Sequence, residues 1–466
     1  MRRSWSVLAL ALVVACSPTG GTTARSVATP TLVPSPSPPM VLTGSIDGAA
    51  YRAEIPSSWQ GTLFLYSHGY EEPGQRRPPA DSPSPQVTQW LLDHGYAIAA
   101  SAYRSAGWAV GDAFKDQMAL LDLFEKRVSK PKRVIAIGGS LGGIITAGLA
   151  QLYRGRFAGA LALCGVLAGG VANWNTGLDA AYAFKTLLAP ASKLQLVHIT
   201  NQKANLELAM SIFNAANTTA AGRARLALVA AVSDLPGWFD PTSPEPAPAD
   251  FVTMAANQAK WESQIDFGFE FALRGELEHR AGGNPSWNTG VDYGRQLIIS
   301  PYAVEVAALY SAAGLNLNSD LRTLNAGRRI AADPIAVSYL RRNINFNGRL
   351  SVPVLTVHTT GDGLVIPQNE TAYANVVKAA GKQDLLRQLY VHRAGHCAFT
   401  AAETIAAVTT LVSRLDLGRW DDTELAPAEL NARAKALGDQ YNNVGGFFAA
   451  APAFTAFSPG PYPRSG

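Results

Sequence analysis

The sequence predicts an α/β protein in which a mostly parallel β-sheet is flanked by helices and carries a large helical insertion. Two observations predict this class. Short apolar runs of strand length alternate with segments of good helix formers through residues 61–170, as a parallel sheet requires. About 185 residues then separate the run that ends at Gly165 from the next one near Val352, far more than an ordinary connection contains.

The sharpest motif of the chain is Gly138-Gly139-Ser140-Leu141-Gly142. It follows the apolar run 134–137, which suits a short buried strand, and precedes residues 144–153, which favour a helix. Flanking glycines tolerate a strained turn, and the first turn of a helix directs free N–H groups toward the serine. A strand, a tight turn with a serine, and a helix are the context in which G-x-S-x-G carries a nucleophile. An ordinary serine in a glycine-rich turn is the alternative.

Three further apolar runs, residues 61–67, 352–358 and 385–391, also read as strands. Each ends at a polar segment: the first at His68-Gly69-Tyr70, the second at Gly361-Asp362 and the third at Gly395-His396. Ser140, Asp362 and His396 therefore follow one another in the chain, each just beyond the carboxyl end of an expected strand.

This order of residues resembles the α/β-hydrolase superfamily of serine hydrolases, which includes esterases and lipases. The resemblance covers roughly residues 45–170 and 350–416. It implies an α/β-hydrolase fold in which Ser140 is the nucleophile, His396 the general base and Asp362 the group that orients the histidine. It also implies an oxyanion hole built from the N–H of Leu141 and that of Gly69 or Tyr70. No cofactor is implied, because such a triad acts unaided.

The remaining candidates have plainer interpretations. His358 lies within an apolar run and is expected to be a core histidine, whereas His68 is expected to shape the oxyanion loop. His392 precedes His396 by four residues, a metal-binding spacing on a helix, but the strand and Gly395 argue against a helix there, so no metal site is predicted. Asp362 by itself also suits a turn, because Gly-Asp-Gly is turn chemistry.

The N-terminus predicts export. Met1-Arg2-Arg3 is basic, and residues 7–15 form an apolar stretch too short to span a bilayer, so residues 1–15 read as a signal peptide. Val13-Val14-Ala15-Cys16 resembles the lipobox of bacterial lipoproteins, which implies lipidation of Cys16 and a membrane-anchored enzyme at the cell surface or in the periplasm. Cleavage near Ala24 and free secretion is the alternative. Residues 16–40 are rich in Ser, Thr, Pro and Gly and suit a flexible tether.

Charge and composition exclude other functions. The chain has 39 Lys and Arg residues against 35 Asp and Glu residues, and cleavage of the signal would remove Arg2 and Arg3. Such a balance argues against nucleic-acid binding and against electrostatic docking to membranes.

Two cysteines remain if Cys16 is lipidated. Cys164 ends the strand expected after the nucleophile helix and Cys397 follows His396, so both should lie at one edge of the sheet. We therefore predict a Cys164–Cys397 disulfide, which suits an oxidising compartment; two free buried thiols are the alternative. The His-Cys pair also resembles tannases and feruloyl esterases, although Gly139 stands where their pattern has a cysteine before the serine.

The expected organisation is a hydrolase core of residues 41–168 and 350–418, a helical cap of residues 169–349 inserted after the sixth strand, and a tail of residues 419–466 packed on the body. In this superfamily such a cap covers the active site and supplies its apolar walls. The pattern predicts helices in the cap at residues 177–188, 205–214, 220–232, 248–271, 301–313 and 334–343.

The cap contains a short repeat. Residues 173–179, which include Trp174, are echoed by residues 286–292, which include Trp287. Asn, Thr and Gly before an apolar helix suit a turn with an N-cap. The alternative interpretation places one or both tryptophans on the pocket wall.

The function expected from these features is hydrolysis of small-molecule or polymeric carboxylic esters through an acyl-enzyme. A serine peptidase of the same fold, resembling aminopeptidases, is the first alternative. It would need acidic cap residues for the substrate amine, and Glu276 and Glu278 are conceivable, although a solvated helix face explains them better. A non-catalytic binding protein is the second alternative, and the intact Ser140, Asp362 and His396 speak against it.

Overall fold

The computed structural model describes residues 39–75, 78–80 and 82–464. The described residues belong to one compact unit. The expected signal peptide, Cys16 and the tether up to residue 38 lie outside the described residues. The tether as predicted is slightly too long, because the first strand already begins at Met40.

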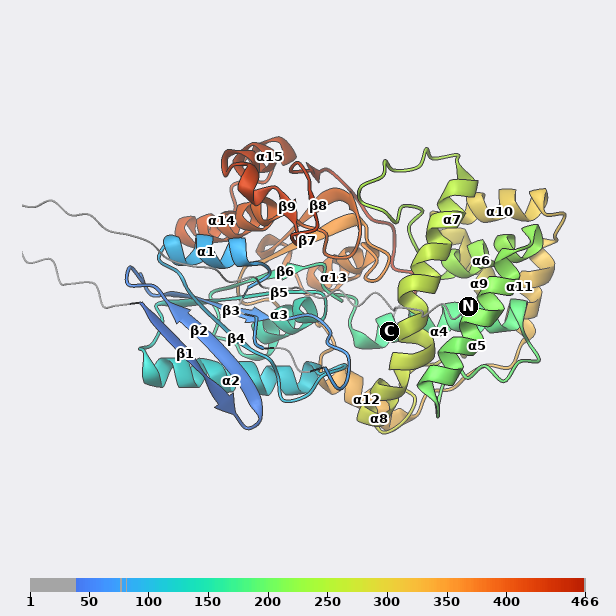
Figure 1. Cartoon of the computed structure of the whole chain (residues 1–466), viewed down its shortest axis with the longest axis horizontal. Helices are drawn as coiled ribbons and strands as arrows, with labels where there is room; N and C mark the ends of the chain where they lie inside the picture. Colours follow the sequence, from blue (N-terminus) through green and yellow to red (C-terminus); the bar gives the residue numbers. More distant parts are fainter. Residues whose placement is uncertain (1–38, 76–77, 81, 465–466) are drawn as a thin grey trace, which may run out of the picture. The chain divides into compact units, whose positions relative to one another are not determined.

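The described residues form a nine-stranded sheet with the order β1-β2-β4-β3-β5-β6-β7-β8-β11 (Figure 1). The six strands from β4 to β8 pair in parallel, whereas β1, β2 and β11 join the edges in antiparallel fashion. The strands are β1 (Met40–Ile46), β2 (Ala49–Ile55), β3 (Thr62–Ser67), β4 (Ala97–Ser101), β5 (Arg133–Gly139), β6 (Gly159–Leu163), β7 (Val354–Gly361), β8 (Leu386–Ala394) and β11 (Phe454–Thr455). The α/β-hydrolase fold class is confirmed.

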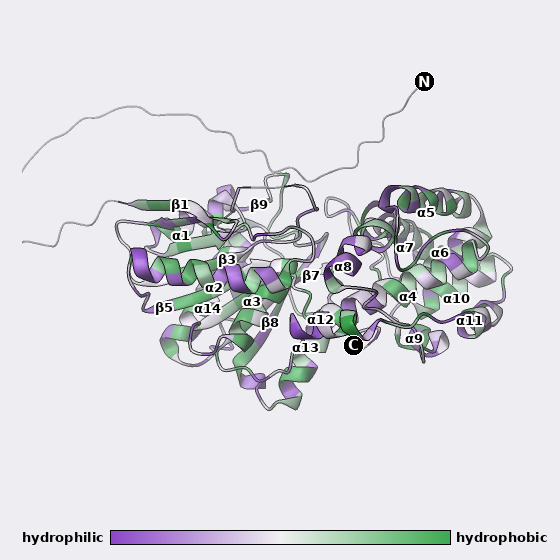
Figure 2. Cartoon of the chain, turned by 90° about the horizontal axis from the view of Figure 1, so that it is seen from below, coloured by the Kyte–Doolittle hydropathy of each residue, from purple (hydrophilic) through white to green (hydrophobic). Residues whose placement is uncertain are grey.

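Helices cover both faces of this sheet (Figure 1). One layer contains α1 (Pro85–Asp93) and α14 (Ala401–Leu417), and the other contains α2 (Val110–Arg127) and α3 (Leu141–Leu152). The sheet is buried on both sides, so its central strands are apolar throughout; every residue of β3, for example, is buried. Figure 2 shows the same strands and α3 in mostly hydrophobic colours.

A second group of helices lies between β6 and β7 in the chain and has an apolar core of its own, in which the ring of Phe267 contacts those of Phe184 and Phe271 edge-to-face. Its helices are α4 (Gly170–Leu188), α5 (Gln202–Asn217), α6 (Ala220–Val232), α7 (Phe251–Trp261), α8 (Arg274–Ala281), α9 (Tyr293–Ile299), α10 (Ala303–Ala312), α11 (Leu317–Ala326) and α12 (Pro334–Arg342). We call this group the cap.

The sequence pattern misplaced parts of the cap. The predicted helix 248–271 is instead α7 followed by two π-helical segments (Glu262–Asp266 and Phe269–Leu273), and the helical run continues past residue 271 into α8. The short helices α9 and α11 were not predicted. Both follow segments that contain glycine and asparagine, residues 282–290 and 314–316.

The two copies of the repeated segment differ in structure: the second is a turn that ends at Asp292, the N-cap of α9, as its residues suggest, whereas the first is not. The first copy lies inside α4, so its Asn and Gly are helical residues and the N-cap interpretation is wrong there. The second copy is a loop that binds the first. The N–H of Trp287 donates to Asn175 Oδ1 at 3.0 Å, and Ser286 Oγ donates to the carbonyl of Trp174 at 3.0 Å.

The C-terminal segment connects the sheet to the cap. Residues of β11 pair with β8, with Phe454 opposite Val391. Ten residues further on, Arg464 donates to both carboxylate oxygens of Asp179 at 3.0 Å, and Asp179 is fully buried in α4. The tail before β11 holds the short helix α15 (Pro427–Ala436).

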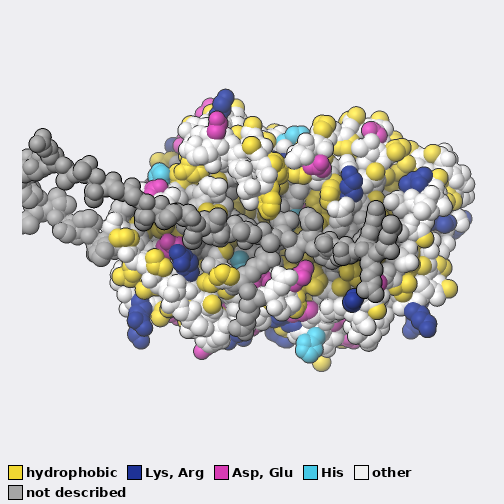
Figure 3. Space-filling model, in the orientation of Figure 1, with side chains coloured by type: hydrophobic (Ala, Val, Ile, Leu, Met, Phe, Trp, Pro, Cys, Tyr) yellow, Lys and Arg dark blue, Asp and Glu magenta, His cyan; other side chains and the backbone are white. Residues whose placement is uncertain are grey.

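The visible face of the molecule has no large area of a single charge sign. On the face seen in Figure 3, Lys and Arg side chains are interspersed with Asp and Glu side chains, in agreement with a formal net charge of +4 for the chain. None of the helices in the described residues is long and apolar enough to cross a bilayer.

We predict that Arg464→Met destabilises the protein, because it leaves the buried Asp179 without its counter-charge. Removal of one partner of a buried ion pair lowers the free energy of unfolding by about 3–5 kcal/mol. Urea unfolding of wild type and variant measures this loss. Asp179→Asn in the Arg464→Met background should restore most of this loss. Arg295→Met is the control, because the pair of Arg295 with Asp292 is exposed. Equal stability of wild type and Arg464→Met would contradict the assignment of this pair.

Candidate active site

Ser140 stands in a strained turn between β5 and α3. Its φ angle is +58°, in a region of backbone conformation that residues other than glycine rarely adopt. The flanking glycines permit the turn: a Cβ on Gly138 would lie 2.5 Å from the carbonyl oxygen of Ser67, and one on Gly142 would collide with the same oxygen. The turn is fixed from behind by the Ser140 N–H, which donates to the carbonyl of Leu163 at 2.9 Å. The serine side chain is therefore presented at the carboxyl edge of the sheet.

The loop after β3 approaches Ser140 closely. A Cβ on Gly69 would lie 3.4 Å from Ser140 Cβ, so this glycine lets the backbone come near the serine. His68 stacks on Tyr103 at 3.9 Å between ring centres, and its Nδ1 lies 2.8 Å from the carbonyl oxygen of Gly69. Tyr70 and Leu141 both line the cavity that contains Ser140. The predicted oxyanion residues thus surround the serine.

Asp362 and His396 contact each other directly. His396 Nδ1 lies 2.8 Å from Asp362 Oδ2, and the other carboxylate oxygen accepts the N–H groups of Leu364 and Val365 at 3.1 and 3.0 Å. Asp362 is fully buried. Burial raises the pKa of this carboxyl, but the charges and hydrogen bonds of His396 and His358 outweigh it and hold the pKa below the ordinary value. Asp362 is therefore a stable buried anion that fixes the histidine ring.

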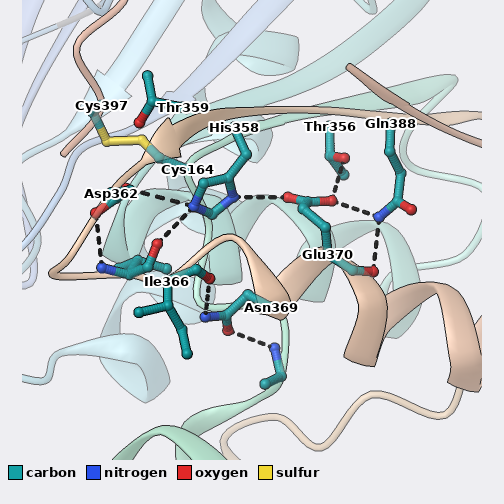
Figure 4. Close-up of polar contacts among 12 residues, drawn as sticks. Cys164, Thr356, His358, Thr359, Asp362, Ile366, Asn369, Glu370, Gln388 and Cys397 are labelled. Carbon is teal, nitrogen blue, oxygen red and sulfur yellow. Dashed lines mark hydrogen bonds and ion pairs between the residues drawn. A yellow bond between two sulfur atoms is a disulfide. The ribbon is translucent and has the colours of Figure 1, made fainter. Parts of the chain in front are cut away.

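A second histidine, the fully buried His358, lies on the other side of Asp362 (Figure 4). His358 Nδ1 is 3.0 Å from Glu370 Oε1, and its Nε2 is 2.7 Å from the carbonyl oxygen of Val365 and 3.5 Å from Asp362 Oδ2. Both ring nitrogens face acceptors, so the ring carries two protons and a positive charge. Burial alone would lower the pKa of His358, but Asp362 and Glu370 raise it to about 10. The expected core histidine is thus a buried cation.

Glu370 is itself held in place from two strands. Thr356 Oγ1 and Gln388 Nε2 both donate to Glu370 Oε2, the latter at 2.6 Å (Figure 4). The sequence analysis missed Glu370 because it lies in the helix after β7, α13 (Gln368–Ala379), without any motif.

The structure joins Cys164 and Cys397 in the disulfide that the sequence predicts, with Cα atoms 5.4 Å apart. A Cβ on Gly139 would lie 3.7 Å from Cys397 Sγ, so the bridge passes directly behind the residue before Ser140. Cys397 Sγ also lies 3.5 Å from His396 Nε2. The bridge thereby holds the histidine loop against the serine turn. Within the described residues Ser140 Oγ and His396 share no hydrogen bond; such bonds are often long in the absence of substrate.

Metal binding finds little support at these residues. Within the described ranges, Cys164, His396 and Cys397 are the one group with suitable ligand spacing, and two of its three ligands are consumed by the disulfide. His392 points elsewhere, toward Glu245 at 3.4 Å.

A cavity of about 100 Å³ opens over Ser140. The core contributes Tyr70 and Leu141, the loop after Asp362 contributes residues 363–366, and the C-terminal segment contributes Tyr462. The cap contributes aromatic walls, in particular Trp174 and Phe269. For the first copy of the repeat, the pocket-wall alternative is therefore the one that the structure supports, whereas Trp287 packs under Arg464.

The charged residues of the cap differ from those that the sequence suggested. Glu276 pairs with Arg280 and accepts the N–H of Trp108, and Glu278 is 6% exposed and pairs with Arg274, so neither belongs to a solvated face. Neither lines the cavity. Its charged wall consists instead of Asp266, Glu270 and Arg274, which are four residues apart and share one side of the helical run. This spacing was visible in the sequence but could not be assigned to the pocket without the fold.

Comparison with known proteins gives one close relative. The chain is 30% identical over 430 residues to an o-phthalyl amidase of Xanthobacter agilis, an alignment that covers 84% of this chain and 90% of that protein. No protein-family model matches. Among solved structures, an esterase of Aspergillus oryzae is 12% identical with a TM-score of 0.39 and coverages of 82% and 80%. An acylaminoacyl peptidase of Pyrococcus horikoshii is also 12% identical, with a TM-score of 0.35. The aligned region covers 76% of this chain and 37% of the peptidase.

The charge on His358 predicts a pH dependence of stability. Its pKa is raised from 6.5 to about 10 in the folded protein, so the stabilisation is complete below pH 6.5 and is lost as the pH rises through 10. The free energy of unfolding of the wild type should fall across this range, by on the order of 5 kcal/mol. His358→Gln should remove this fall, because glutamine does not titrate. His392→Gln, at a half-exposed histidine, should retain it. The same fall in His358→Gln as in wild type would contradict a buried cation.

Proposed function

The chain belongs to the same family of α/β-hydrolase-fold enzymes as the o-phthalyl amidase of Xanthobacter agilis, and from that premise we propose that it is a serine hydrolase that cleaves amides of aromatic carboxylic acids. Ser140, His396 and Asp362 carry the reaction in this proposal. The observation that supports it most strongly is the buried Asp362–His396 pair, tied by the Cys164–Cys397 bridge to the strained turn of Ser140.

In the first half of the reaction Ser140 Oγ attacks the amide carbonyl carbon. His396 Nε2 accepts the hydroxyl proton, and Asp362 stabilises the resulting imidazolium through Nδ1. The tetrahedral oxyanion accepts hydrogen bonds from the N–H of Leu141 and from that of Gly69 or Tyr70. One such donor typically raises the rate by a factor of about 10²–10³. The C–N bond then breaks, and the proton on Nε2 passes to the leaving amine. An acyl-serine remains.

Water completes the cycle. His396 removes a proton from a water molecule, whose oxygen attacks the acyl carbon, and the serine oxygen leaves with that proton. The net reaction adds one water and yields a carboxylic acid and an amine. The same groups also cleave esters of the same acids, because an alkoxide is a better leaving group than an amide nitrogen; the ester activity expected from the sequence belongs to this proposal.

Two features support an aromatic amide as the substrate. The relative with 30% identity is an amidase by name and covers most of the chain. The cavity over Ser140 is walled by several aromatic rings, among which Tyr70 meets Phe269 edge-to-face at 5.2 Å and Trp108 meets Trp174 at 5.5 Å. Such walls suit a planar ring.

We also propose that the enzyme is exported and anchored through a lipidated Cys16. The basic start, the short apolar stretch and the lipobox-like residues support it, as does a disulfide next to the active site, which suits an oxidising compartment.

Anchoring predicts that the wild-type protein expressed in a bacterium partitions into the membrane fraction. Cys16→Ser should move it to the soluble exported fraction with its hydrolase activity intact. Membrane association that is unchanged in Cys16→Ser would contradict a lipid anchor at this residue.

The catalytic assignment predicts that a fluorophosphonate probe labels the wild type and not Ser140→Ala. Asp362→Asn should lower kcat/KM for a benzoyl 4-nitroanilide by about 10⁴-fold, because the histidine loses its orienting anion. Asp416→Asn, at an exposed ion pair with Arg133, is the matched control and should behave as wild type. Labelling of Ser140→Ala, or full activity of Asp362→Asn, would overturn the assignment.

A further inference from the structure

The last described segment of the chain runs from the sheet to the cap and passes the active-site cavity on the way. We call residues 456–464, which follow β11, the strap. The core holds its first half. Thr371 Oγ1 donates to the carbonyl of Pro459 at 2.9 Å. The ring of Phe457 also meets that of Tyr390 edge-to-face at 5.4 Å, so the strap starts from a fixed point on the sheet.

The cap holds the other end of the strap. Arg464 donates to both carboxylate oxygens of Asp179 at 3.0 Å, and its guanidinium lies 5.5 Å from the ring centre of Trp287. Between the two ends, every second residue from 459 to 463 is a proline. Proline fixes its own φ angle and restricts the residue before it, so the strap is stiff as well as held at both ends.

Tyr462 is the residue of the strap that lines the cavity, and it stands between two prolines. Thr176 of α4 lines the cavity as well. Asp179, which binds the strap two residues beyond Tyr462, lies one helical turn further along α4. Tyr462 is therefore placed at the α4 end of the cavity. Burial raises the pKa of its phenol, so the side chain presents a neutral ring there.

The other aromatic walls of the cavity are backed by further rings. Trp174 meets Trp108 edge-to-face, and Phe269 meets Tyr70 in the same way. Among the described residues, no aromatic ring pairs with that of Tyr462 in this manner. Removal of the Tyr462 ring therefore opens the cavity without breaking an aromatic pair.

The cavity is small. Its volume is about 100 Å³, and an apolar cavity of roughly 150 Å³ in another protein takes up a benzene ring. A single aromatic ring therefore fills the space over Ser140. A second, fused ring needs space that a wall residue occupies.

We propose that Tyr462 determines specificity by closing the α4 end of the cavity, so that the enzyme accepts acyl groups with one aromatic ring and rejects those with two fused rings. This rests on the proposed function, because it names the acyl group that Ser140 receives. The strap cannot yield easily to a larger acyl group, since the core and the cap hold its ends. A difference of one methylene in an apolar pocket changes kcat/KM by about 10- to 200-fold, so a second ring should be strongly disfavoured.

The test compares the 4-nitroanilides of benzoic acid and 2-naphthoic acid in wild type and Tyr462→Ala. The ratio of kcat/KM for the naphthoyl substrate to that for the benzoyl substrate should rise at least about 10-fold in Tyr462→Ala. Misfolding cannot produce this result, because the variant gains activity on the larger substrate. An unchanged ratio in an active Tyr462→Ala would overturn the proposal.

Two further variants separate the Tyr462 ring from the strap as a whole. Tyr462→Phe retains the ring and should keep the wild-type ratio. Phe457→Ala removes another ring of the strap, which is 40% exposed and does not line the cavity; it should also keep the wild-type ratio. The same gain in either variant as in Tyr462→Ala would contradict a size limit set by the Tyr462 ring.

The proposed function is monitored separately. Fluorophosphonate labelling of Ser140 and turnover of the benzoyl anilide by the wild type report on the nucleophile and on the aromatic acyl group. If both are present and the ratio does not change in Tyr462→Ala, the role of Tyr462 alone is refuted. If both are absent, the proposed function fails, and the role of Tyr462 that rests on it fails as well.

Discussion

The structure depends on keeping Asp362 ionised where no water reaches it. An isolated carboxylate at full burial would take up a proton. Asp362 avoids this because His396 and His358 flank one of its oxygens and two backbone N–H groups bind the other. His358 is in turn charged because Glu370 faces its far side. Negative and positive groups therefore alternate from Glu370 through His358 to Asp362, and the orientation of the His396 ring depends on partners contributed by β7 and α13.

Segments far apart in the sequence converge on this chain of charges. The Cys164–Cys397 bridge spans 233 residues and ties the loop of His396 to the end of β6, behind the turn of Ser140. The cap covers the serine and contributes rings and an arginine, whereas the last described residues bring Tyr462 to the cavity and secure the cap through Arg464 and Asp179. The sheet thus brings Ser140, Asp362 and His396 to one edge, and the cap and tail form walls of the cavity above Ser140.

The sequence predicted the parts that depend on local rules. Strands buried on both faces are continuous apolar runs, and the turn at Ser140 needs glycines at fixed positions, so the core and Ser140, Asp362 and His396 could be located. The cap could not be predicted as well, because amphipathic periods do not reveal which face meets a pocket. Asp266, Glu270 and Arg274 look like an ordinary charged helix until the fold places them over Ser140. His358 likewise reads as a core residue, and only the position of Glu370 shows that it is charged.

The central claim is that Ser140 carries the acyl group between the two halves of the reaction. The most direct test is intact-mass analysis of the full-length protein, quenched in acid shortly after mixing with 4-nitrophenyl benzoate, followed by peptide mapping. If Ser140 carries the acyl group, a transient adduct of one benzoyl group should appear on the peptide that contains Ser140 and should decay at the rate of turnover. Turnover without any adduct, or an adduct on another residue, would contradict it.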